Sequence, residues 1–111
     1  MKDLAHTFSA LSDPTRLQLV EKMMTRGELP VGELAAGAGI SAPAISRHLK
    51  VLRQAGLIRQ RVEGTRRYCS VQPEAIQAIS DWTMDHRQFW KGGLERLEGL
   101  LALDPGPEDN R

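Results

Sequence analysis

The sequence predicts a mainly α-helical domain that carries one small β-hairpin. Apolar residues recur at helical spacing over most of the chain, and proline and glycine residues separate the helical segments. Two short strand-like runs, at 57–62 and 66–71, are separated by a turn sequence. A length of 111 residues suits a single domain, which we expect over 1–103. The acidic segment 104–111 is expected to be a disordered tail.

Two helices are predicted in the N-terminal part. The first is short and amphipathic, and its apolar residues are Leu4, Phe8 and Leu11. The second begins at Asp13-Pro14, where the aspartate is a good N-cap and the proline a good first helical residue. Gly27 is expected to end it.

Two further helices are predicted over 31–36 and 42–55. Gly37 and Gly39 are expected to break the first of them, and Ser41 is expected to be the N-cap of the second. The buried stripe of the second helix comprises Ile45, Leu49 and Leu52. Two helices joined by a glycine-containing turn form a helix-turn-helix.

A basic hairpin follows these helices directly and suggests a wing. Glu63-Gly64 is expected to form its turn. In the second strand, Arg67, Cys69 and Val71 share one face, while Arg66, Tyr68 and Ser70 share the other. Cys69 is the only cysteine, so the chain forms no intramolecular disulfide. An inert core residue is the favoured interpretation of Cys69, and a redox switch is the alternative.

The last helix is predicted to begin at Pro73 and to continue to about residue 103, a length of about 45 Å. Gly92-Gly93 is expected to weaken it and to allow close helix packing or a kink. The last helix carries more apolar surface than one helix can bury against so small a body. Such a patch predicts an interface. Trp82, His86 and Trp90 share one face, where packing is the favoured interpretation and a pH- or ligand-responsive pocket is the alternative.

Positive charge is concentrated in one quarter of the chain. Residues 41–67 hold seven cations against Glu63 alone, a net charge of +6, whereas the whole chain carries only +1. This asymmetry predicts a polyanionic partner. No run approaches the roughly 20 apolar residues that span a bilayer, and no secretory apolar region opens the chain, so we expect a cytoplasmic protein.

The helix over 42–55 is the predicted DNA-reading element, because a major groove admits one helix and is read near its N-terminal end. Arg47 and Lys50 are expected to contact guanine or phosphates, and the hairpin arginines to contact phosphates or the minor groove. The predicted DNA-binding residues are Ser41, Ala42, Ala44, Ser46, Arg47, Lys50, Gln54, Arg61, Arg66 and Arg67. His48 lies nearer the buried stripe, and packing is favoured over base contact.

Five segments together resemble one family. They are 11–17 (LSDPTRL), 31–35 (VGELA), 41–52 (SAPAISRHLKVL), 55–58 (AGLI) and 63–68 (EGTRRY). The chain is therefore similar to the ArsR/SmtB-type winged helix-turn-helix transcriptional repressors over about residues 4–101. The resemblance implies a homodimer, formed through the first and last helices, that represses by binding an inverted-repeat operator.

The resemblance also implies the interface residues and a branch of the family. The expected interface comprises Leu4, Phe8, Trp82, Phe89, Trp90, Leu94, Leu97 and Leu101. Phe89-Trp90 resembles a branch that lacks the metal-sensing sites, and the segment 34–37 (LAAG) replaces the cysteine pair of arsenic and cadmium sensors. We expect no metal and no cofactor, although a weak intersubunit metal site at His86 and an unidentified small-molecule effector stay open as alternatives.

Other functional classes fit the sequence less well. No phosphate-binding glycine loop, nucleophile elbow or metal-ligand spacing is present, so no enzyme is predicted. A winged helix that binds protein is a further alternative, which the cationic face disfavours.

Overall fold

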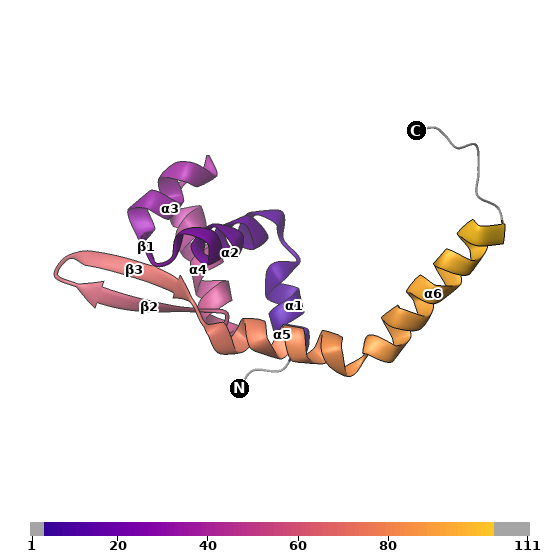
Figure 1. Ribbon diagram of the computed structural model, residues 1–111. Coiled ribbons are helices and arrows are strands. Elements are labelled where there is room, and N and C mark those ends of the chain that lie inside the picture. Colours follow the sequence, from indigo (N-terminus) through magenta and orange to yellow (C-terminus); the bar gives the residue numbers. More distant parts are fainter. Residues whose placement is uncertain (1–3, 104–111) are drawn as a thin grey trace. The chain divides into compact units, whose positions relative to one another are not determined.

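The computed structural model describes residues 4–103 and is mainly helical with one small sheet, which confirms the predicted class (Figure 1). The expected tail at 104–111 lies outside the described residues. The chain forms two compact units, one up to Ala78 and one from Ile79. The elements are α1 (Leu4–Leu11), α2 (Pro14–Arg26), β1 (Leu29–Pro30), α3 (Val31–Ala38), α4 (Ala42–Gln54), β2 (Ile58–Glu63), β3 (Arg66–Val71), α5 (Pro73–Asp85) and α6 (Arg87–Leu103).

The predicted caps of α2 and α4 are confirmed. The Asp13 carboxylate accepts a hydrogen bond from the backbone N–H of Arg16 at 3.0 Å, and the Ser41 hydroxyl accepts one from Ala44 N–H at 3.3 Å. Each satisfies an N–H that has no partner within its helix. Gly27 follows α2 at φ 84°, a left-handed conformation that favours glycine.

The predicted end of α3 was too early. The helix continues through Gly37 to Ala38 and ends at Gly39, which has φ 71° in the left-handed region. A glycine ends a helix where this conformation is needed, and only the second of the two glycines adopts it. Gly37 lies within the helix beside the Lys22 ammonium group, which is 2.5 Å from where a Cβ would stand.

The hairpin is confirmed, but its turn is Gly64-Thr65 and not the predicted Glu63-Gly64, because Glu63 still pairs with Arg66. It belongs to a three-stranded antiparallel sheet of order β1-β3-β2. Ile58 pairs with Val71 and Glu63 with Arg66, so the hairpin is in register along its whole length. The strand β1, which the sequence reading missed, pairs Leu29 with Cys69. Two residues, one of them a proline, are too few to show the alternation by which strands are predicted.

The core of the first unit fixes the orientation of α4. Ile45, Leu49 and Leu52, the predicted stripe, are fully or almost fully buried. The remaining core residues are Ala10, Leu19, Val20, Met23, Leu29, Leu34, Ala55, Leu57, Ile58, Cys69 and Ala75. Because its inner stripe is buried, α4 presents its opposite face to solvent. Leu57, fully buried, connects α4 to the hairpin and holds both elements on one body.

The prediction of a single C-terminal helix was wrong, because the helix breaks at His86. The backbone N–H of His86 bonds the Thr83 carbonyl, three residues earlier, at 3.1 Å. Side chains take the neighbouring carbonyls: His86 Nδ1 lies 2.7 Å from Trp82 O, and the Trp90 indole N–H donates to Thr83 O at 3.3 Å. In a continuous helix the Trp82 carbonyl would accept the backbone N–H of His86, and here the His86 ring takes its place. The Thr83 carbonyl accepts both the His86 N–H and the Trp90 indole N–H.

Candidate nucleic-acid interface

The outer face of α4 carries most of the predicted contact residues. Ser46, Arg47, Lys50 and Gln54 are all exposed. At its N-terminal end Ser41 and Ala42 are exposed, whereas Ala44 is half-buried. The Ser41 hydroxyl caps the helix through Ala44 N–H, so it has a structural role whatever else it contacts.

Arg47 and Lys50 are cations without an ion-pair partner among residues 4–103. They stand three positions apart and therefore on neighbouring turns of one helix face. An exposed cation without a carboxylate beside it attracts phosphate without first breaking an internal bond. This face is therefore chemically suited to a polyanion.

Two further cations lie at the tip of the hairpin. Arg66 and Arg67 follow the Gly64-Thr65 turn, and both are exposed. Consecutive strand residues point to opposite faces, so the two guanidinium groups flank the hairpin on both sides. The part of the chain that the structure describes offers neither of them an ion-pair partner.

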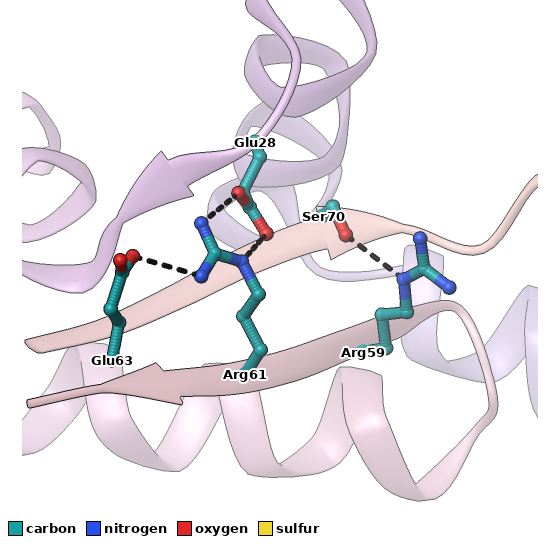
Figure 2. Close-up of polar contacts among 5 residues, drawn as sticks. All are labelled: Glu28, Arg59, Arg61, Glu63 and Ser70. Atoms are coloured by element: carbon teal, nitrogen blue, oxygen red, sulfur yellow. Dashed lines mark hydrogen bonds and ion pairs between the residues drawn. The ribbon is translucent and has the colours of Figure 1, made fainter.

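Arg61, also predicted to bind DNA, has a different environment (Figure 2). Its Nε and Nη2 donate to the two carboxylate oxygens of Glu28, each at 2.8 Å, and its Nη1 donates to Glu63 at 3.0 Å. The guanidinium also lies over the Tyr68 ring, 4.6 Å from its centroid. The hydrogen bond from Arg61 is the main reason that the pKa of Glu28 is lowered.

The remaining basic residues of the segment bind neutral partners. Arg53, near the end of α4, donates to the Gln60 side chain on β2 at 3.0 Å, and Arg59 lies 3.4 Å from the Ser70 hydroxyl across the hairpin (Figure 2). Neither guanidinium group has an ion-pair partner among residues 4–103. Arg53 links α4 to the first half of the hairpin.

His48 lies on the inner side of α4, beside the start of α2. Its Nδ1 is 3.4 Å from Arg16 Nη1 and 3.9 Å from the Asp13 carboxylate. Arg16 also donates through Nε to the Ala10 carbonyl of α1 at 2.6 Å. Arg16 therefore connects three helices, a role that the sequence reading missed because it treated Asp13-Pro14 only as a helix start.

The second unit exposes an apolar surface along its helices. Phe89 is 78% exposed and Trp90 is 42% exposed. The other large apolar side chains exposed there are Trp82, Met84, Leu94, Leu97, Leu100, Leu101 and Leu103. Trp82 packs on the His86 ring with centroids 4.9 Å apart. In α1 of the first unit, the predicted interface residue Phe8 is also 41% exposed and Leu4 is half-buried.

No three His, Cys, Asp or Glu side chains of residues 4–103 are grouped so that they could hold a metal ion. None of the helices in this range is long and apolar enough to cross a membrane.

Comparison with known proteins decides the family. The family model described as bacterial regulatory protein, arsR family, matches residues 13–60, which contain α2, α3 and α4. The HTH-type transcriptional regulator Rv2034 of Mycobacterium tuberculosis is 41% identical over 94 residues, which cover 85% of this chain and 84% of that protein. The chain belongs to the arsR family of bacterial transcription regulators.

Two other relatives support this assignment. The transcriptional repressor SdpR of Bacillus subtilis is 32% identical over 80 residues, covering 72% of this chain and 88% of SdpR. The crystal structure of an ArsR family transcriptional regulator superimposes with a TM-score of 0.71 and 29% identity, covering 82% of this chain and 97% of that structure. The winged helix-turn-helix fold of this arsR-family chain is thus shared with solved members.

Proposed function

We propose that this arsR-family protein is a homodimeric repressor that binds an inverted-repeat DNA operator. The observation that carries the proposal is the placement of four exposed cations without ion-pair partners among the described residues. Arg47 and Lys50 lie on the outer face of α4, and Arg66 and Arg67 lie at the tip of the hairpin, all on one compact unit. A duplex with a phosphate every few ångströms matches such a surface.

The α4 residues and the hairpin residues have different proposed roles. Arg47 lies in the N-terminal half of α4, the part of a recognition helix that meets base edges. Its guanidinium group can donate two hydrogen bonds to guanine O6 and N7. Ser46 and Gln54 add neutral donors and acceptors on the same face, and Ala42 an apolar contact. Lys50, Arg66 and Arg67 bind phosphates, which sets affinity and register but not sequence.

Dimerisation follows from the apolar surfaces of α1, α5 and α6. Half to fully exposed Leu and aromatic side chains over two successive helices form a surface of the kind that marks an interface. A two-fold pair buries such a surface and places two copies of α4 about one helical turn of DNA apart. The proposed interface consists of Leu4, Phe8, Trp82, Phe89, Trp90, Leu94, Leu97 and Leu101.

Repression is supported by a relative. SdpR is named as a transcriptional repressor, and a protein that covers an operator blocks polymerase without needing contacts to it. Because the proposed partner is DNA, we also propose a cytoplasmic location. We expect no metal cofactor, and an organic effector stays possible within the proposal.

The test is base selection by the Arg47→Ala variant. Sites selected from random duplexes by the wild-type protein should form an inverted repeat. Arg47→Ala should lose about 1–3 kcal/mol on that operator and relax the preference at one position in each half-site. Gln18→Ala, an exposed neutral change on α2, is the control. Equal weakening on operator and random DNA would show that Arg47 only anchors the backbone.

A further inference from the structure

Glu28, Arg61 and Glu63 form an ion-pair cluster on the sheet that the proposed contacts with DNA do not use. Arg61 belongs to β2, one edge of the sheet, and Glu28 directly precedes β1, the opposite edge. Figure 2 shows the Arg61 side chain crossing β3 to reach Glu28. The two residues are 33 positions apart in the sequence. Because they lie at opposite edges of the sheet, their contact spans its full width.

The geometry engages the whole guanidinium group. Two parallel N–H donors meet the two oxygens of Glu28, each at 2.8 Å, and the third nitrogen donates to Glu63 at 3.0 Å. Two-pronged pairing of this kind is the most specific that arginine forms with a carboxylate. The Tyr68 ring covers one face of the group. A phosphate would have to displace a carboxylate to be bound.

The charge of the cluster also disfavours phosphate. Two carboxylates surround one guanidinium, so the cluster carries a net charge of −1. The hydrogen bonds with Glu28 and Glu63 raise the pKa of Arg61 above its ordinary value, and the bond with Arg61 lowers the pKa of Glu28. Both shifts mean that the charged pair is favoured over separated groups.

The half of the hairpin next to the Gly64-Thr65 turn has few buried contacts that stabilise it. The buried contacts of β2 end near its start, where Ile58 is buried, whereas Val62 is 66% exposed. A two-stranded ribbon alone is at best marginally stable in water, and β1 is only two residues long. The contact of Arg61 with Glu28 therefore adds a constraint at the point where packing ends.

We propose that Arg61 is a positioning residue for DNA binding, which ties the outer strand of the hairpin to the segment before β1 and so holds Arg66 and Arg67 in place. This rests on the proposed DNA-binding function. Arg61 itself does not touch phosphate. The contact acts by limiting how far the tip moves, so that its two cations reach the backbone without a large loss of conformational freedom.

Glu28→Gln separates this role from direct phosphate contact, because the two roles predict opposite changes in DNA affinity. If Arg61 positions the hairpin, Glu28→Gln weakens binding to a random duplex about two- to fivefold with an unchanged salt slope. If Arg61 contacts phosphate, the same change frees it, removes a negative charge and tightens binding. Glu21→Gln, exposed on α2, is the matched control for charge.

Charge exchange and a measurement without DNA complete the test. The double variant Glu28→Arg with Arg61→Glu should recover most of the affinity that Arg61→Glu alone loses, which a phosphate contact would not allow. Amide hydrogen exchange at residues 63–67 should be faster in Glu28→Gln than in the wild-type protein. Unchanged exchange overturns the inference even if DNA binding itself were absent, whereas a wild-type protein that fails to bind DNA refutes only the proposed function.

Discussion

Removing both tip arginines is expected to change the salt dependence of DNA binding by a calculable amount. Arg47 is assigned to a base, and Arg53 and Arg59 are hydrogen-bonded to neutral side chains, so we assign Lys50, Arg66 and Arg67 of each protomer to phosphates. A dimer then neutralises about six phosphates, and log affinity falls with log salt at a slope of about −5. Arg66→Ala with Arg67→Ala leaves about two such contacts and a slope of about −2.

This difference is large enough to measure by fluorescence anisotropy. Between 50 and 200 mM KCl the wild-type affinity should fall about 1,000-fold and that of the double variant about 10-fold. Lys22→Ala with Arg26→Ala removes the same charge from α2 and should leave the slope near the wild-type value. Circular dichroism confirms folding, since both tip residues are exposed. A slope that changes by less than one unit would refute the assignment of the tip to phosphate.

Three further outcomes are expected. Leu97→Asp, at a half-exposed position of α6, should place charge in the dimer interface and lower both dimerisation in sedimentation and operator affinity; an intact dimer would contradict the interface. The hydrogen bond from Arg16 N–H lowers the pKa of Asp13 below its ordinary 3.8. Its ionised form therefore stabilises the fold above that pH, and the stabilisation is lost as pH falls through the lowered pKa. The melting temperatures of wild type and Asp13→Asn should accordingly converge as the pH falls below about 4. A difference that stays constant with pH would argue against stabilisation by the ionised carboxylate. Micromolar zinc, cadmium or nickel should change operator affinity less than tenfold relative to a strong chelator, and a larger shift would reveal a metal effector.

The helices were predictable because their signals are local. The side chains of Asp13 and Ser41 each accept a hydrogen bond from the backbone N–H three residues later and so cap α2 and α4. The spacing of Ile45, Leu49 and Leu52 fixes which face of α4 is buried. Each signal depends on residues within about two turns, so it can be read without knowing the rest of the fold. The outward face of α4, the proposed DNA-reading helix, followed from the same spacing.

The break at His86 shows where local signals mislead. Glycines at 92 and 93 are the residues expected to weaken the last helix, yet both lie inside α6. The chain breaks instead where the side chains of His86 and Trp90 take the carbonyls of Trp82 and Thr83. These two hydrogen bonds depend on the side-chain conformations of His86 and Trp90, which the spacing of apolar residues does not encode.

The sequence by itself determined that the basic segment over 41–67 exists and that it lies on a helix and a hairpin. It did not determine which cations are available to DNA. Counting charges treats Arg61 and Arg66 alike, but the tertiary structure pairs Arg61 with Glu28 and leaves Arg66 without a carboxylate partner among the described residues. The physical reason is that an ion pair needs its two groups within about 4 Å, and here the order of the strands in the sheet, not their distance along the chain, brings those groups together.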